Sequence, residues 1–172
     1  MGKTNNYEII GNCVKFLIKT TNKEIPEKKI YFLIDLEDLE LVNKYRWCAR
    51  VVRKDLIYIT STYGIQLHRL IMNCPKNKYV DHINLNTLDN RKNNLRVCTR
   101  YENAQNIKKR KNNSTGYRNV YFNKNENKYC VILRANKKSY FGGYFSNSEE
   151  GKKEAIEKSI EMRRCICPFS TI

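Results

Sequence analysis

A short stretch of the chain, residues 80–106, combines acidic, basic and amide side chains. Asp81 and His82 are adjacent, and Asn94 and Asn103 follow downstream. Hydrolysis of a phosphodiester needs a positioned water, a base that removes its proton, and a cation that neutralises charge on the phosphate and the departing oxygen. An imidazole with its ordinary pKa of about 6.5 suits the base at neutral pH. Residues of the required kinds therefore stand together in this stretch.

The elements that must position these side chains are predicted to be a β-hairpin and a helix. A strand-like run ends in Asp81 and His82, and residues 94–97 return as the second strand. Adjacent residues on a regular strand point to opposite faces, yet Asp81 and His82 must both address one phosphate. We therefore expect the strand to end at this pair. Turn-forming residues at positions 85–90 allow such an ending.

The start of the following helix is predicted from a capping box. Thr99 and Glu102 form the pattern T-x-x-E, which places Asn103 in the first turn. Asn103 and Asn106 are three residues apart and share one helix face. Glu102 could add charge to a metal site or cap the helix, and we favour the cap. Asn is abundant throughout this chain, so the matches at Asn93 and Asn106 deserve the least weight.

The order of these residues carries a resemblance to a known family. DH, then DNR-x-x-NLR, then T-x-x-x-N-x-x-N is similar to the HNH (ββα-metal) endonucleases, especially the intron-borne and free-standing phage homing type. The resemblance implies that His82 is the general base and that Asp81 and Asn103 bind the metal. It also implies that Asn94 is the structural amide that holds the hairpin and orients the histidine. Glu102 stands where we expect glutamine in that family.

The cofactor implied by these ligands is one divalent cation. Carboxylate and amide oxygens are hard ligands, which favour Mg²⁺ or Mn²⁺ over Zn²⁺. Some members of the family hold a structural zinc with two C-x-x-C pairs. The seven cysteines of this chain are scattered without such a pair, so we expect no structural zinc and free thiols in a reducing compartment.

The charge of the chain favours a nucleic-acid partner. Lys and Arg number 33 against 17 Asp and Glu, which gives a formal net charge of +16. Ribosomal and membrane-surface proteins share such a charge, but that class would not explain the motif. With neither a long apolar run nor a signal peptide, we expect a cytoplasmic protein of a bacterial or phage-infected cell, without membrane association. Nothing resembles a dimerising coiled coil, so we expect a monomer without a protein partner that nicks one strand of double-stranded DNA.

The N-terminal residues 1–75 are predicted to form a small mixed β module. Apolar runs alternate with polar breaks, and LIDLEDLELVNKYRW resembles part of the module that often precedes the nuclease core in phage homing enzymes. Trp47 could stack on a base, but a small module needs a large buried residue, so we favour a core position. His68 lies in the apolar run LHRLIM, where a structural role is favoured over a part in the active site.

The C-terminal residues 113–172 are predicted to form three strands and a helix. The segments Tyr117–Val120 and Gly143–Phe145 look like parts of the plant ethylene-response DNA-binding domain, whose sheet enters the major groove. Asn119 departs from the Gly that is frequent in that domain. The basic run upstream is either a solvated linker or a phosphate contact, and we favour the contact. The candidate DNA-binding residues are Lys108, Lys109, Arg110, Lys111, Arg118, Lys128, Arg134 and Lys138.

The predicted fold class is α+β, in a small modular protein. A central ββα-metal hairpin and helix at residues 76–112 stands between the N-terminal mixed β module and the C-terminal three-stranded sheet plus helix. The resemblance implies a metal-dependent DNA endonuclease of the homing type. The alternative is a sequence-biased DNA-binding regulator with an inactive core, which the presence of Asp81, His82 and Asn103 disfavours.

Overall fold

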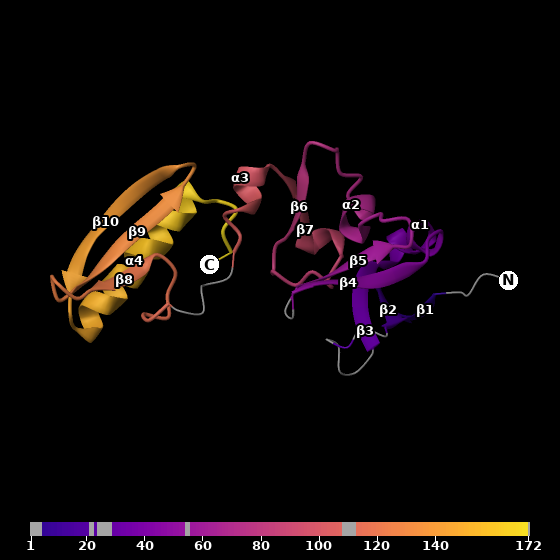
Figure 1. Ribbon diagram of the computed structural model, residues 1–172, viewed down its shortest axis with the longest axis horizontal. Coiled ribbons are helices and arrows are strands. Elements are labelled where there is room, and N and C mark those ends of the chain that lie inside the picture. The colour runs from indigo at the N-terminus through magenta and orange to yellow at the C-terminus, as the bar shows by residue number, and fades with distance from the viewer. Residues whose placement is uncertain (1–4, 21–22, 24–28, 54–55, 108–112, 172) are drawn as a thin grey trace. The chain divides into compact units, whose positions relative to one another are not determined.

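The structure, a computed structural model, describes residues 5–20, 23, 29–53, 56–107 and 113–171. The chain forms two compact units, Met1–Arg100 and Tyr101–Ile172. Both units mix short strands with helices (Figure 1), which confirms the predicted α+β class. No helix within the described ranges is long and apolar enough to span a membrane.

The first unit begins with a three-stranded antiparallel sheet in the order β1-β2-β3. Two further hairpins, β4-β5 and β6-β7, follow it, with short helices between the strands. The elements are β1 (Asn6–Ile10), β2 (Cys13–Lys19), β3 (Lys29–Asp35), η1 (Leu36–Asp38), α1 (Leu39–Asn43), β4 (Trp47–Arg53), β5 (Leu56–Ser61), α2 (Leu67–Ile71), β6 (Tyr79–His82), η2 (Lys92–Asn94) and β7 (Leu95–Cys98). Helix α3 (Arg100–Asn103) crosses the boundary between the two units.

One apolar core runs through the first unit. Alternate residues of β2 and β3 are buried, as the period of a strand requires, and the rings of Phe16 and Phe32 stack at 4.9 Å. Trp47 belongs to this core and its indole N–H donates to the carbonyl of Val42 at 2.9 Å, which confirms its predicted core position. Val80 of β6 and Leu95 of β7 are buried in the same core. The hairpin predicted as a separate module therefore shares its core with the N-terminal strands.

The second unit is a three-stranded sheet covered by one long helix. Strands β8 (Val120–Asn123), β9 (Lys128–Ala135) and β10 (Lys138–Ser146) pair antiparallel in the order β10-β9-β8, and α4 (Glu149–Ile166) packs against them. This sheet and helix agree with the sequence prediction. Gly151 lies in the first turn of α4, where a Cβ atom would come within 2.3 Å of the Ser146 carbonyl oxygen. A glycine at this position therefore permits the close approach of α4 to β10.

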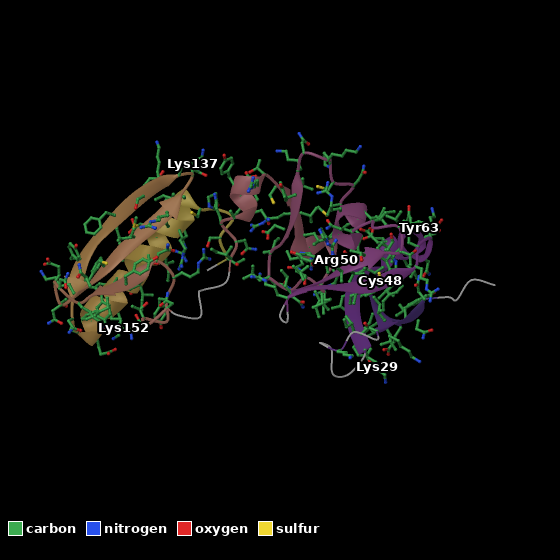
Figure 2. All side chains as sticks on the ribbon, in the orientation of Figure 1. Lys29, Cys48, Arg50, Tyr63, Lys137 and Lys152 are labelled. Atoms are coloured by element: carbon green, nitrogen blue, oxygen red, sulfur yellow. The ribbon has the colours of Figure 1, made fainter. Side chains whose placement is uncertain are left out.

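Basic side chains project from several elements of this second unit. Lys137 lies in the turn between β9 and β10, where its φ is +63°, and Lys152 projects from α4 (Figure 2). The apolar clusters beneath them are small, one around Val120 and Val131 and another around Leu133 and Ala135. The second unit therefore depends on less buried apolar surface than the first.

Candidate active site

The candidate catalytic pair lies at the end of β6, in the antiparallel hairpin with β7. Asp81 pairs with Arg96 and His82 with Leu95, and both Asp81 and His82 are buried, with 5 % of each residue exposed. The strand ends at His82, as predicted, and the Leu85 N–H closes a turn on the His82 carbonyl at 2.9 Å. Leu85 adopts a φ of +62°, which sharpens the turn away from the strand.

Asp81 is paired with an arginine from the opposite strand. The Nε and NH2 groups of Arg96 donate to Oδ2 of Asp81 at 2.8 and 2.7 Å. The two residues face each other in the hairpin register, so the contact follows from the pairing of β6 with β7. A cation therefore stands beside the candidate metal ligand. The sequence prediction missed Arg96, although its position in NLR already placed it opposite the acid.

His82 is held by the side chain of Asn90. The Oδ1 atom of Asn90 lies 3.2 Å from Nε2 of His82, and Asn90 is completely buried. The Nδ2 group of Asn90 donates to the Thr87 carbonyl at 3.4 Å, which turns its oxygen towards the imidazole. An amide oxygen only accepts hydrogen bonds, so we assign the proton to Nε2 and the basic lone pair to Nδ1. Asn90 is a second residue that the sequence prediction missed.

Asn94 closes the loop that carries Asn90. Its Oδ1 accepts from the backbone N–H of Asn84 at 2.9 Å, and its Nδ2 donates to the Asp89 carbonyl at 2.8 Å. Its own carbonyl accepts from the N–H of Ile83 at 2.8 Å. Asn94 thus ties both ends of residues 83–90 together, and the direct contact with His82 comes from Asn90.

The same loop is paired with the edge of the N-terminal sheet. The Leu33 N–H of β3 donates to the Leu88 carbonyl at 2.9 Å, and the Leu33 carbonyl accepts from the Asn90 N–H at 2.8 Å. Strand β3 lies at the edge of its sheet, so its outward N–H and C=O groups need partners. The loop supplies them, and Asn90 takes its position from a strand far away in the sequence.

Ion pairs fasten the second half of the loop. The guanidinium of Arg91 donates to both carboxylate oxygens of Asp89 at 2.8 Å, which lowers the pKa of Asp89. Lys92 contacts Glu37 at 2.6 Å and Asp38 at 2.9 Å. The acidic group formed by Asp35, Glu37 and Asp38 could itself hold a cation, but Lys92 already supplies one. These contacts anchor the loop to η1.

Two further aromatic rings pack around His82. The ring centroid of His68, on α2, lies 5.2 Å from that of His82, and the ring of Tyr58, on β5, lies 6.3 Å away. His68 is buried, and burial together with the charges of His82 and Arg69 lowers its pKa to about 3. His68 therefore packs directly on the candidate base.

The electrostatic environment of His82 has opposing parts. Burial lowers its pKa, while the hydrogen bond that it donates to Asn90 and the charges of Asp81 and Asp89 act in the opposite direction. Because the effect of burial is the largest, His82 keeps its basic, uncharged form below its ordinary pKa.

Asn103, the other candidate metal ligand, is the last residue of α3. The helix begins at Arg100, directly after Thr99, as the capping box predicts. Asn103 is half-buried and belongs to the second unit, whereas Asp81 and His82 belong to the first. Its part in a metal site stays a prediction.

The candidate DNA-binding residues differ in their surroundings. Lys108, Lys109, Arg110 and Lys111 lie outside the described residues. Lys128, Arg134 and Lys138 are exposed on the sheet of the second unit. The guanidinium of Arg118 instead donates to oxygens of its own unit, including the Gln105 carbonyl at 3.0 Å. A hollow of about 550 Å³ is bordered by three arginines, Arg118, Arg134 and Arg163, and none of the described residues that line it is acidic.

The face of this sheet opposite α4 combines aromatic and basic groups. Val131 and Leu133 of β9 point towards the helix, so Arg134 points to the other face. On that face Tyr121 and Tyr144 flank Cys130 in register, and both tyrosines are about half exposed. Such a surface suits contact with a nucleic acid.

A hairpin that carries an adjacent acid and histidine, closed by an asparagine and followed by a short helix, is the arrangement of the ββα-metal nucleases. Comparisons with known proteins agree with this class. A family model described as HNH endonuclease matches residues 67–105. An uncharacterized HNH endonuclease, L560, of Acanthamoeba polyphaga mimivirus is 30% identical over 140 residues, which cover 77% of this chain and 68% of that protein. No solved structure is significantly similar to the chain. The chain belongs to the HNH endonuclease family.

Proposed function

We propose that the protein is a metal-dependent endonuclease of the homing type that nicks one strand of double-stranded DNA. The observation that carries this proposal is the buried pair Asp81–His82, whose imidazole is fixed through Nε2 by Asn90. In a family of nucleases, a buried histidine whose Nε2 is held by an amide oxygen is suited to act as a general base.

His82 takes the proton of the attacking water at Nδ1, while its Nε2–H stays on the Asn90 oxygen. The positive charge that develops on the ring is stabilised by the nearby carboxylates of Asp81 and Asp89, which already favour the charged form. Asn94 keeps the loop closed and so holds Asn90 in place. The chain therefore supplies a base in a fixed orientation before substrate binds.

Asp81 and Asn103 would hold the cation, a single Mg²⁺ or Mn²⁺. A carboxylate and an amide are the hard oxygen donors that these ions prefer. When bound, such an ion neutralises charge on the scissile phosphate and the departing oxygen. Arg96 directs two hydrogen bonds to Oδ2 of Asp81. When an ion binds, the Asp81 carboxylate therefore has either to contact the ion and Arg96 together or to release Arg96 in favour of the ion.

The second unit would hold the DNA. Lys128, Arg134 and Lys138 are exposed, and the aromatic face beside Arg134 can lie against the duplex as the sheet of ethylene-response domains does. The basic run at residues 108–111 would add phosphate contacts. The internal hydrogen bonds of Arg118 favour a structural role for it over contact with DNA.

One observation favours the alternative function, a DNA-binding regulator with an inactive core. The Arg96–Asp81 pair places a permanent cation where the metal would bind. If the metal cannot replace or accompany this guanidinium, the protein would bind DNA without cutting it.

A nicking assay on supercoiled plasmid separates the two functions. The unaltered chain should convert it to open circles with Mg²⁺ or Mn²⁺ and not with chelator. His82→Ala should lose about 10²–10⁴ in rate while DNA affinity stays within a few fold, since the imidazole acts on water. Asn93→Ala, an exposed amide of the same segment, is the matched control. DNA binding without metal-dependent nicking in the unaltered chain would establish the regulator instead.

A further inference from the structure

The segment that follows α3 is fastened to the C-terminal end of the described chain. Asn106 is 95 % buried, with 5 % exposed, and its Oδ1 accepts hydrogen bonds from the backbone N–H of Thr171 at 3.3 Å and from the Thr171 hydroxyl. The side-chain oxygen of Gln105 accepts from the backbone N–H of Phe169 at 3.2 Å. Two consecutive residues of the nuclease motif thus bind one irregular segment, Phe169–Thr171, which we call the tail.

Arg118 joins the same two segments. Its NH2 group donates to the Gln105 carbonyl at 3.0 Å, and its NH1 group donates to the Ser170 hydroxyl at 3.1 Å and the Thr171 carbonyl at 3.4 Å. The backbone of Arg118 is itself fixed to α4, because its carbonyl accepts from the Ser159 hydroxyl at 2.8 Å. A guanidinium offers several donors in a rigid plane, which allows this one side chain to connect three partners.

These contacts continue directly into α3. The Asn106 N–H donates to the Asn103 carbonyl at 3.3 Å, and the Gln105 N–H donates to the Glu102 carbonyl at 3.0 Å. A helix of a single turn has little stability of its own, so its position depends on what its ends are attached to. The attachment at its C-terminal end is the tail and Arg118. This also gives a role to Asn106, which the motif includes beside Asn103.

We propose that the tail and Arg118 are positioning elements for the metal ligand Asn103. The inference rests on the proposed function of Asn103. None of these residues contacts the reacting atoms; they act by holding α3 within the second unit. Losing one of them should weaken metal binding, while contacts with DNA remain.

The test compares two arginine deletions that change the net charge equally. Arg118→Ala removes the connection, and Arg164→Ala removes an exposed arginine from α4. Mn²⁺ binding is measured from the loss of the electron paramagnetic resonance signal of the free ion, and DNA affinity is measured in chelator. Arg118→Ala should weaken Mn²⁺ binding about 10-fold or more, the range found when groups that orient a metal ligand are removed. Its DNA affinity should match that of Arg164→Ala.

A milder pair of variants keeps the test valid if Arg118→Ala does not fold. Thr171→Val deletes only the hydroxyl that Asn106 accepts from, and Thr171→Ser retains it. Thr171→Val should speed amide hydrogen exchange at residues 105–107 and weaken Mn²⁺ binding, whereas Thr171→Ser should restore both.

Three further outcomes can be told apart, and the first two overturn the proposal. Loss of DNA affinity in Arg118→Ala beyond that of Arg164→Ala, with unchanged Mn²⁺ binding, would make Arg118 a DNA contact. If the unaltered chain binds no Mn²⁺, the assignment of Asn103 as a metal ligand and the inference drawn from it both fail. Mn²⁺ binding that responds as expected in a chain that does not nick DNA would support the positioning role and reject only the nuclease activity.

Discussion

The two parts of the nuclease motif are held in different ways. In the first unit, the loop with Asn90 pairs through backbone groups with the edge of β3, above one continuous apolar core. In the second unit, the segment after α3 is held mainly by side chains, those of Gln105, Asn106 and Arg118, beside small apolar clusters. Hydrogen bonds between backbone groups survive most substitutions, because nearly every residue has the same backbone groups. A hydrogen bond from a side chain is lost when that one residue is replaced. The position of the proposed base His82 should therefore be robust, and that of the proposed metal ligand Asn103 adjustable.

The largest effect should come from removing a backbone donor of the first unit. Leu33→Pro deletes the N–H that bonds the Leu88 carbonyl. Since this N–H points away from the sheet, β3 can tolerate the proline as an edge strand does, while the loop loses its partner. We expect nicking to fall at least about 100-fold, because small displacements of a catalytic group have costs of this size. Rates are compared on supercoiled plasmid.

Leu33→Ala is the control for that variant. It shortens the same side chain and keeps the N–H, so its rate should stay within a few fold of the unaltered chain. Equal losses in both variants would mean that the Leu33 side chain, rather than backbone pairing, secures the loop.

A smaller effect should follow from removing the contact on His82. Asn90→Ala deletes the oxygen that faces Nε2, so both neutral tautomers become populated and the rate should fall about 10- to 100-fold. Asn90→Asp keeps an acceptor and should recover part of the rate. The chain has 2 histidines, so nitrogen-detected NMR can read the tautomer of His82 directly. A tautomer unchanged in Asn90→Ala would remove Asn90 from this role.

The packing of His68 predicts a dependence of stability on pH in the first unit. Its folded pKa of about 3 lies below the ordinary value of 6.5. As the pH falls below 6.5, the unfolded chain therefore binds a proton that the folded chain does not, and stability is lost until about pH 3. The loss should be on the order of 5 kcal/mol, because one pKa unit corresponds to about 1.4 kcal/mol. His68→Gln should flatten the curve of unfolding free energy against pH, and parallel curves would contradict the burial of an uncharged His68.

The smallest effects should come from single basic residues of the second unit. Lys128→Ala and Arg134→Ala should each weaken DNA binding a few fold and flatten the log-log dependence of affinity on salt by about 0.9 if a phosphate contact is lost. If Arg134 reads a base instead, preference at one position should relax by about 1–3 kcal/mol. Lys152 lies on α4, which covers the other face of the sheet, so Lys152→Ala should change neither the DNA affinity nor its dependence on salt. Similar effects of all three would show that only net charge matters.

The sequence predicted the hairpin, its end at His82 and the sheet with its helix, because these depend on local patterns. It did not predict which amide reaches His82. Several asparagines stand in this loop, and the choice of Asn90 depends on pairing with β3, which the local sequence does not encode. Arg118 was predicted to bind DNA, and its internal contacts were missed for the same reason, since its partners include residues of the tail.

The predicted boundary near residue 75 illustrates a second limit. Alternating apolar residues show that a strand is buried on one face, but they do not show what covers that face. Val80 and Leu95 complete the core begun by β2 and β3, so the hairpin and the N-terminal strands form one unit.

Arg96 also bears on which ions the protein can use. Because its guanidinium already balances the carboxylate of Asp81, an ion that enters the proposed metal site competes with a charge that is already present. A sodium or potassium ion would bring no more charge than the arginine provides and would still have to shed water. A doubly charged ion gains about twice the Coulomb attraction from the same carboxylate, which favours it in this competition. We therefore expect Arg96 to make Asp81 selective, so that the abundant monovalent cations of a cell do not bind there while the scarcer divalent cations do.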